Sequence, residues 1–340
     1  MPQITLIVYD ENFDPVAEID TAEVLWVSRY DTTGEFTIKT QADSDTIGLY
    51  RPGRLIQKAP IEAWGVIEKL TIDMTQDGQQ ILTVSGRTAD CIMERRVWES
   101  VDNANVSDIG QAISDIVGHF TGTRALHVTV DTSEADSLTI ESFVQERRGK
   151  SLLYLTQEVV QAGECGYSFT YDRSTKKFIL KPYKGQNDTD VIFSPEFDTV
   201  KSAQYINDRQ GIITHAYIAG EGEDEERVIT EIDTGQAGLE RYESWIDARD
   251  LQKGKATDSQ YLSLLKQRGM EKIAESTFTE AFAGEVVQVS TQWVYGKDYM
   301  LGDRVMVEVK NWGITAWYRI TELTEQQNSA GYQCQPTFAK

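Results

Sequence analysis

Histidines and serines are the first residues to test for catalysis in this chain of 340 residues. His119, His127 and His215 lack the His-Glu-x-x-His spacing with which two imidazoles on one helix face bind zinc. No Gly-x-Ser-x-Gly sequence, which places a nucleophilic serine on a sharp turn, is present. His119 falls at the end of a predicted helix and is interpreted as a helix-end or surface residue. Hydrolase chemistry of either kind therefore has little support.

Three cysteines, Cys91, Cys165 and Cys334, lie far apart in the sequence. An odd number at such separations favours neither a disulfide framework nor a zinc site of the Cys-x-x-Cys type. Cys165 lies within a glycine-rich helix exit, where a buried thiol is a simpler interpretation than a nucleophile. We expect all three to be reduced thiols in the core.

Carboxylate pairs such as Glu221 with Asp224, or Asp298 with Asp303, could flank the bond that a glycosidase cleaves. The chain contains 54 acidic residues, however, so pairs at this spacing arise by chance. We therefore predict no catalytic residue, no metal ligand and no cofactor, and we expect that the protein is not an enzyme.

One short segment begins like a calcium-binding loop. Asp10, Asn12 and Asp14 match the first three ligand positions of such a loop. Pro15 and Thr21 occupy the positions where it needs a glycine for the bend and a glutamate for bidentate ligation. The segment is predicted to be the turn of a β-hairpin.

A second segment, Gly149-Lys150-Ser151, ends like a phosphate-binding loop. The first glycine of that motif would fall at Val144, so the backbone cradle for phosphate is missing. Ser151 is predicted to be the N-cap of a helix instead.

The composition is acidic, with enough apolar residues to form sizeable cores. Asp and Glu total 54 against 33 Lys and Arg, which gives a formal charge of −21 and disfavours binding to phosphate backbones. No apolar run reaches the roughly 20 residues that span a bilayer, and the segment 1–20 lacks the basic flank of a secretion signal. We expect no specific nucleic-acid binding and no membrane-spanning segment.

Periodicity predicts strands at both ends of the chain. Apolar residues at every second position, separated by turn residues, predict strands over most of 1–100, beginning with a hairpin of 4–9 and 16–19. Clean alternation returns at 305–309. Between these regions, helical spacing predicts helices at 106–120, with Asn105 as N-cap, and in two later segments, 151–161 and 258–275.

A weak repeat links the two β regions. Tyr50, Gly53, Arg54, Leu55, Ile67 and Leu70 recur in the same order as Tyr299, Gly302, Arg304, Val305, Ile320 and Leu323. In both places a glycine turn leads into a strand and a later strand enters a hairpin. This favours two copies of one small barrel-like fold.

These patterns predict a mainly β fold with an α+β insertion: two related small β-barrel domains plus peripheral α/β elements. The expected division is a first barrel at 1–100, an inserted α+β domain at 101–195, strands completing the first barrel and leading to the second at 196–235, a loop and helix insertion at 236–283, and a second barrel at 284–340.

Short motifs, each a turn joined to a strand or helix, are spread over nearly the whole chain. They are Val8-Tyr9-Asp10-Glu11-Asn12-Phe13, Gly34-Glu35-Phe36, Gly65-Val66-Ile67-Glu68, Val84-Ser85-Gly86-Arg87 with Arg95-Arg96, Gly149-Lys150-Ser151-Leu152-Leu153, Tyr299-Met300-Leu301-Gly302-Asp303-Arg304-Val305 and Pro336-Thr337-Phe338. In order and spacing they resemble a siphophage tail protein family, that of tail and baseplate hubs. The positions expected to matter structurally are Gly34, Phe36, Gly65, Gly86, Arg87, Arg95, Gly149, Ser151, Gly302, Asp303, Arg304 and Pro336.

The resemblance implies a baseplate hub in which two related β-barrel domains per chain associate as a homotrimer, so that six similar barrels match a six-fold tail tube. Its implied partners are further copies of itself, the tail tube, distal tail proteins and a tip or receptor-binding protein, with DNA passing through the ring. Its implied location is the tail tip of the virion, after synthesis in the host cytoplasm. We expect a hub without a distal wall-digesting module, and an acidic inner face that repels DNA.

Two alternatives to this structural role stay open. One is a carbohydrate- or receptor-binding tail module that uses exposed aromatics among Trp245, Trp293, Trp312 and Trp317, although most of these are predicted to lie in barrel cores. The other is a tail-associated cell-wall hydrolase.

Overall fold

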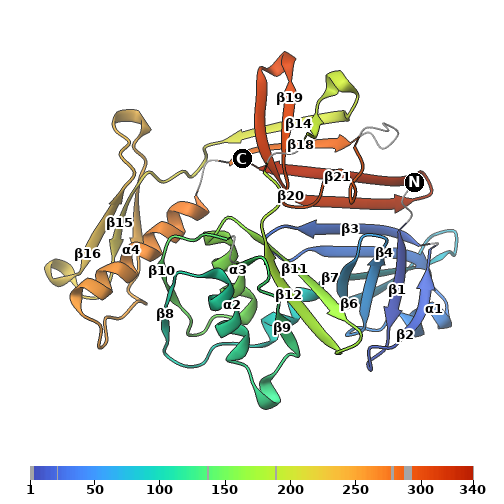
Figure 1. Cartoon of the computed structure of the whole chain (residues 1–340), viewed down its shortest axis with the longest axis horizontal. Coiled ribbons are helices and arrows are strands. Elements are labelled where there is room, and N and C mark those ends of the chain that lie inside the picture. The colour runs from blue at the N-terminus through green and yellow to red at the C-terminus, as the bar shows by residue number, and fades with distance from the viewer. Residues whose placement is uncertain are drawn as a thin grey trace.

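The computed structural model describes residues 4–20, 22–135, 138–187, 190–276, 279–286 and 293–339. In this part of the chain a sheet of thirteen strands forms the centre, and two smaller units of helices and strands are attached to it (Figure 1). The mainly β fold that the sequence predicts is confirmed.

The first β region is antiparallel. Its elements are β1 (Thr5–Tyr9), β2 (Pro15–Ile19), β3 (Glu23–Arg29), β4 (Glu35–Gln41), α1 (Ser44–Leu49), β5 (Leu55–Ala59), β6 (Ala63–Met74) and β7 (Gln80–Thr88). β1 and β2 form the predicted hairpin, in which the Asp10 amide donates to the Asp14 carbonyl at 2.9 Å. Phe36 and Ile38 of β4 are buried whereas Glu35 is exposed, as alternation across a half-buried strand requires.

The insertion has a core of its own. Its elements are the 3-10 helix Ala89–Arg95, β8 (Asn103–Val106), α2 (Ile109–Gly118), the 3-10 helix Gly122–Arg124, β9 (Val128–Val130), β10 (Phe143–Glu146), α3 (Leu152–Ala162), β11 (Gly166–Asp172) and β12 (Lys177–Tyr183). The two helices pack against each other and share an apolar cluster with Tyr167 and Leu180 of the small sheet. The packing of these helices explains the helical periodicity of the sequence here.

Helix α2 begins later than predicted, and the assignment of Asn105 as its N-cap is wrong. Asn105 pairs with Val144 in the ladder between β8 and β10. Asp108 caps the helix instead, since its carboxylate accepts a hydrogen bond from the Gln111 amide at 2.7 Å. Val106 belongs to the strand but is buried in the same core as the helix, so it imitates helical spacing.

The second β region surrounds a peripheral unit. The region consists of β13 (Ile192–Phe193), β14 (Val200–Asp208), β18 (Thr279–Val286), β19 (Arg304–Val309), β20 (Ile314–Asn328) and β21 (Gly331–Ala339). The peripheral unit, at the left of Figure 1, consists of β15 (His215–Ala219), β16 (Ile229–Asp233), β17 (Glu243–Asp247) and α4 (Asp258–Glu275). The predicted helix at 258–275 is thus confirmed. It packs on the small sheet through Tyr261 and Leu265.

The two β regions repeat one strand order. The order is β3-β4-β7-β6-β5 in the first β region and β14-β18-β21-β20-β19 in the second. These two β regions are called the first and the second module below. The turn before the last strand repeats as well: the Gly53 amide donates to the Ile67 carbonyl at 2.7 Å, and the Gly302 amide to the Ile320 carbonyl at 2.8 Å. Both glycines have positive φ angles, 94° and 93°, which glycine adopts without steric cost. The repeat in the sequence therefore marks equivalent structural positions.

The modules are joined edge to edge. Glu322–Gln327 of β20 pairs antiparallel with Val24–Arg29 of β3, and Figure 1 shows β20 between β21 and β3. One apolar core, which includes Trp26 and Phe282, runs beneath both modules. Among the described residues eleven strands follow one open path, from which β19 and β13 branch at β20, so two separate closed barrels are not seen there.

Candidate functional site

The three histidines belong to three different parts of the fold. His119 caps the C-terminus of α2, as predicted, and its ring stacks on the Trp98 indole with 3.6 Å between ring centroids. His127 lies in the turn before β9 with a φ of 52°. His215 on β15 is buried, with its ring nitrogens 3.3 Å from the carboxylates of Glu231 and Asp233 but not aligned for hydrogen bonds. The histidines are thus not assembled into one site.

The cysteines are buried thiols, as predicted. Cys91 lies in the 3-10 helix after β7, Cys165 precedes β11, and Cys334 lies in β21. Burial raises the pKa of these thiols to about 12, 11 and 12, respectively. A nucleophilic cysteine needs the opposite shift.

The Gly302-Asp303-Arg304 turn holds the second module to the end of the insertion. The buried Asp303 carboxylate accepts hydrogen bonds from the amides of Gln186 and Met300, both at 2.8 Å. The Arg304 amide donates to the Gln186 carbonyl at 2.7 Å. Asp303 is therefore a backbone-capping residue and not one of a pair of free carboxylates.

Other acidic candidates also bind backbone amides. Asp298 accepts a hydrogen bond from the Val294 amide at 2.8 Å, and Glu221 accepts one from the Lys253 amide at 3.1 Å. Asp10 accepts two amide hydrogen bonds within its own turn, at 2.8 and 3.0 Å. These contacts identify the segment that begins like a calcium loop as a hairpin turn.

The Gly149-Lys150-Ser151 motif begins helix α3, as predicted. The Ser151 hydroxyl accepts an amide hydrogen bond at 3.1 Å. The Lys150 ammonium lies 3.2 Å from the Glu158 carboxylate, so it is engaged within the chain. Gly149, at a φ of 78°, donates its amide to the Trp98 carbonyl at 2.8 Å. The motif therefore connects the start of α3 to the segment that follows the 3-10 helix Ala89–Arg95.

Three of the motifs meet at Phe36, whose ring stacks on Trp26 with 4.9 Å between centroids. A Cβ at Gly65 would lie 2.5 Å from the Phe36 ring, and one at Gly86 would lie 1.9 Å from a backbone oxygen of the neighbouring strand. A Cβ at Gly34 would lie 2.1 Å from another carbonyl oxygen. These glycines allow the close packing of strands around one aromatic pair.

The remaining motif residues are dispersed. Arg87 forms ion pairs with Glu68 at 2.9 Å and Glu94 at 2.8 Å, which connect β7 to β6 and to the 3-10 helix. Arg95 ends that 3-10 helix and is exposed. Pro336 is buried in β21. The motif residues thus serve packing and turns in several places and do not converge on one cavity.

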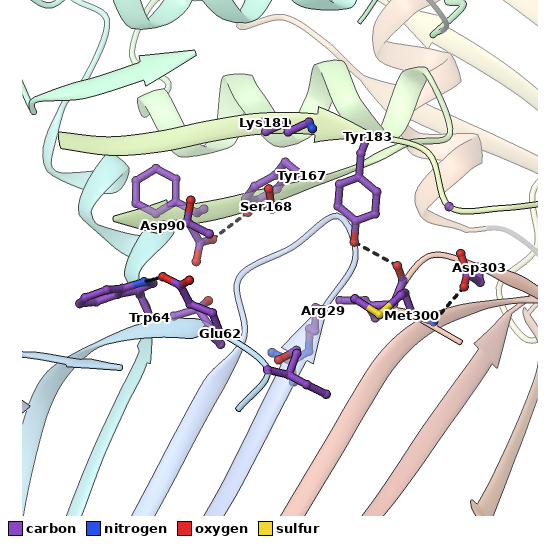
Figure 2. A pocket seen from close by; sticks show the side chains of 18 of the residues that line it. Arg29, Glu62, Trp64, Asp90, Tyr167, Ser168, Lys181, Tyr183, Met300 and Asp303 are labelled. Carbon is purple, nitrogen blue, oxygen red and sulfur yellow. Dashed lines mark hydrogen bonds between the residues drawn. The ribbon is translucent and has the colours of Figure 1, made fainter. Parts of the chain in front are cut away.

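A pocket of about 550 Å³ lies between the large sheet and the insertion (Figure 2). Trp64, Tyr167 and Tyr183 contribute rings to its walls. The Tyr183 hydroxyl donates to a backbone oxygen of the loop before β19 at 3.1 Å. Arg29, at the side of the large sheet, is held by the Glu322 carboxylate at 2.7 Å. The pocket therefore lies where both modules and the insertion meet.

Asp90 is the buried carboxyl of this pocket. It accepts hydrogen bonds from the hydroxyls of Thr33 at 2.6 Å and Tyr167 at 2.7 Å. Burial raises the pKa of Asp90 and holds that of Tyr167 well above its ordinary value. Because its donors come from the β3–β4 turn and from β11, Asp90 connects the first module to the insertion.

Two strand edges present apolar side chains to solvent. Among the described residues, Lys69–Met74 of β6 pairs on one side only, with β7, and β14 pairs only with β18. Ile72, Met74 and Ile206 on these edges are exposed. Unpaired backbone groups beside apolar side chains favour pairing with a strand of another chain. Sequence reasoning missed both edges. The repeat matches Lys69–Met74 to Glu322–Gln327, but only the fold shows which of the two has a partner strand within the chain.

The tryptophans divide between core and surface. Trp293 is half-buried and donates its indole N–H to the Ile192 carbonyl at 3.0 Å, and Trp317 on β20 is half-buried. Trp245 and Trp312 are exposed, and none of the four is fully buried, so the prediction that most of them lie in barrel cores is wrong. Trp245 is exposed because α4 covers only the other face of its sheet.

The described residues contain neither a metal-binding cluster nor a membrane-spanning helix. No three His, Cys, Asp or Glu side chains there gather into a metal site. Nor does any helix of that part of the chain combine the length and apolarity needed to span a membrane. The features that stand out are the pocket and the two strand edges.

The architecture is that of phage tail proteins. The tail protein from Neisseria meningitidis MC58 matches with a TM-score of 0.60 at 11% identity, over 99% of this chain and 96% of that chain. The 43 kDa tail protein of prophage MuSo2 from Shewanella oneidensis gives 0.57 at 14% identity, over 98% and 97%. Prophage tail protein gp18 from Listeria monocytogenes EGD-e gives 0.54 at 12% identity, over 98% and 94%. At these identities the likeness shows the fold alone.

The chain belongs to the family described as Siphovirus ReqiPepy6 Gp37-like protein, which matches residues 5–339. The resemblance to siphophage tail proteins drawn from the sequence is thereby confirmed. No curated protein matches the chain. Family and fold agree with a structural role in the tail.

Proposed function

We propose that this protein is a structural hub of a phage tail tip, three copies of which form a ring between a six-fold tail tube and the distal tip. The repeated strand order carries the proposal. Two modules in each of three chains give six similar units, which matches six-fold symmetry without a six-chain assembly. In this proposal the modules are the two barrel-type hub domains, and the insertion at 101–195 and the peripheral unit lie outside the ring.

The open strand edges support ring formation. The edge of β20 is covered by β3 within the chain, whereas the matching edge of β6 and the outer edge of β14 have no partner among the described residues. A ring satisfies both edges of every copy, because each copy meets one neighbour at each end of its sheet. A monomer would leave both exposed.

The bore of the proposed ring is lined by the part of the sheet face opposite the shared core that the insertion leaves open, since Leu55 and Val66 on that face pack against Tyr171 and Phe178 of the insertion. On this part of the face Glu23 lies beside Lys39 in the ladder, and β6 carries Lys69 and Asp73. Thr and Gln residues continue the same face on β7, β20 and β21. In this proposal the lining is mostly polar, with Leu25 among charges of both signs, and it differs from the acidic lining expected from the net charge. DNA passes such a surface with little net attraction or repulsion.

Light scattering on the purified chain tests the proposal, with a mass three times that of the chain as the expected result. Gold-labelled antibody against the peripheral unit should then mark the end of intact tails, between the tube and the tip proteins. A stable monomer at high protein concentration, or label distributed along the tube, would sink the hub assignment.

Exposed Trp245 favours a second candidate function, carbohydrate or receptor binding by the peripheral unit. Its ring lies on the uncovered face of the small sheet beside Tyr217, and the Arg227 guanidinium lies 5.7 Å from the ring centroid. Aromatic rings next to charged side chains bind sugars by stacking and hydrogen bonds. Trp245→Ala should abolish binding to host cell-wall glycans if this function is present, while Trp312→Ala, an equally exposed control, should not.

A further inference from the structure

The junction inside the chain has a defined register. In the ladder between β3 and β20, Arg29 lies opposite Glu322, Val27 opposite Thr324, and Leu25 opposite Gln326. The Tyr30 amide donates to the Thr321 carbonyl at 2.9 Å. Tyr30 and Thr321, next to Arg29 and Glu322 in the ladder, are therefore a hydrogen-bonded pair. Because hydrogen-bonded and non-hydrogen-bonded pairs alternate, the opposition of Val27 and Thr324 is a non-hydrogen-bonded pair with closely spaced side chains.

The repeat transfers this register to the open edge of β6. Ile67 and Ile320 occupy equivalent positions, and in both strands the ladder is interrupted directly afterwards, between Ile67 and Lys69 and between Ile320 and Glu322. Lys69–Met74 is therefore the equivalent of Glu322–Gln327. The strand that would cover it must be the equivalent of β3.

That equivalent of β3 is β14. Phe36 of β4 lies opposite Trp26, and Phe282 of β18 lies opposite Tyr205. On its other side, Phe36 lies opposite Gly86 of β7, and Phe282 lies opposite Phe338 of β21. Gly86 and Phe338 are equivalent because they lie opposite Ile67 and Ile320, respectively. Trp26 therefore corresponds to Tyr205, and Arg29 to Asp208.

We propose that β14 of one copy pairs antiparallel with Lys69–Met74 of the next copy, in the register that places Asp208 opposite Lys69, Ile206 opposite Thr71 and Gln204 opposite Asp73. This inference rests on the proposed ring and names the contact that closes it. The junction between copies is then a repeat of the junction within each copy, and the sheet continues from chain to chain.

Burial supports this contact. On the core side of the in-chain junction Leu323, Glu325 and Gln327 are 0%, 2% and 9% exposed. Their equivalents on β6 are Leu70, Ile72 and Met74, and the last two are 49% and 70% exposed although they are more apolar. An apolar stripe where the matching stripe is buried indicates a surface that is covered in the assembly.

Charge supports the same register. The Arg29 guanidinium and the Glu322 carboxylate form an ion pair at 2.7 Å across the in-chain junction. The equivalent positions between copies carry Asp208 and Lys69, which are opposite charges in exchanged places. Asp208 already accepts a hydrogen bond from the Gln210 amide through Oδ1, which leaves Oδ2 for the lysine. A register shifted by one residue would lose this match.

A disulfide between copies tests the register. Thr71→Cys combined with Ile206→Cys in one chain places thiols in a non-hydrogen-bonded pair, where Cα atoms about 4.5 Å apart suit a disulfide. Mild oxidation should convert most of the chains to covalent trimers on a non-reducing gel. Asp73→Cys with Ile206→Cys, two residues out of register, should give little cross-linking. Val27→Cys with Thr324→Cys should form a disulfide within one chain and verifies the oxidation conditions.

The charge pair gives a second measurement. Lys69→Glu alone and Asp208→Lys alone should each raise the trimer dissociation constant roughly tenfold, and the double variant should restore it. A trimer by light scattering without cross-linking at 71 and 206 would overturn the proposed contact and leave the hub function standing. A chain that forms no trimer would overturn both, and cross-linking of the out-of-register pair alone would overturn the register.

Discussion

Lys58 and Glu325 form an ion pair in the interior, where their side chains are 1% and 3% exposed. Lys58 lies on β5 of the first module and Glu325 on β20 of the second, so the pair crosses the junction between them. Glu325 also accepts a hydrogen bond from the Tyr332 hydroxyl at 2.9 Å. A buried charge with only one of its partners left is costly, which makes this pair sensitive to single substitutions.

Lys58→Met should therefore lower the free energy of unfolding by about 3–5 kcal/mol, because it leaves the Glu325 carboxylate buried without its cation. Urea unfolding followed by tryptophan fluorescence measures the loss. Lys58→Met combined with Glu325→Ile should recover most of it, since isoleucine is the residue at the equivalent position of the first module, Ile72. Equal losses in the single and double variants would contradict the prediction.

Gly86→Ala should destabilise the first module by about 1–3 kcal/mol, the usual cost of overpacking. The added Cβ would lie 1.9 Å from the Val66 carbonyl oxygen and 2.9 Å from the Phe36 ring. Gly48→Ala is the matched control, because Gly48 lies in α1 with nothing within 4 Å of the added atom. There alanine should stabilise the helix slightly. The two melting temperatures should move in opposite directions, and a shared direction would argue against the packing described.

Local elements could be predicted because their signals are local. The bounds of α4 follow from periodicity together with its N-cap, where Thr257 and Gln260 form a reciprocal capping box. The β1–β2 hairpin follows from alternation and a turn. The start of α2 could not be predicted correctly. Val106 lies in a strand but is buried in the same core as the helix, and an apolar residue is favoured at such a position in either kind of element.

Long-range pairing could not be predicted from such signals. Arg29 and Glu322 are 293 residues apart, and no local pattern states that their strands are neighbours. The repeat comes closest, because it matches Gly53 with Gly302. It does not show that β3 covers the edge of β20 whereas the matching edge of β6 has no partner strand among the described residues.

Asp90→Asn should flatten the pH dependence of stability in the acid range. Burial raises the pKa of Asp90 above its ordinary 3.8, so the folded protein binds this proton more tightly than the unfolded chain does. The contribution of Asp90 to stability is therefore greatest at low pH, and it falls as the pH rises from 3.8 through the folded-state pKa. The melting temperatures of parent and variant, measured from pH 4 to 7, should converge or cross toward neutral pH.

The control for Asp90 is Asp10→Asn, which concerns a carboxylate with the opposite shift. Hydrogen bonds from backbone amides lower the pKa of Asp10, so its stabilising contribution is present above the ordinary pKa and is lost as the pH falls. Its substitution should change the profile in the opposite sense below pH 3.8, so for this pair the melting temperatures are also measured at lower pH. Parallel profiles for the parent and Asp90→Asn would show that Asp90 does not titrate as its burial requires.

Asp303→Ala should loosen the contact between the second module and the end of the insertion. The Asp303 carboxylate is the acceptor for the amides of Gln186 and Met300, and its removal leaves both donors in a partly buried turn without it. Loss of such an acceptor costs about 1–3 kcal/mol, and Asp303→Asn, which keeps one acceptor oxygen, should lose less.

Hydrogen exchange measures the effect locally: the amides of Gln186 and Met300 should exchange faster in the alanine variant, while those of α4 in the peripheral unit should not. Uniform acceleration over the whole chain would indicate global destabilisation and contradict the local role assigned to Asp303.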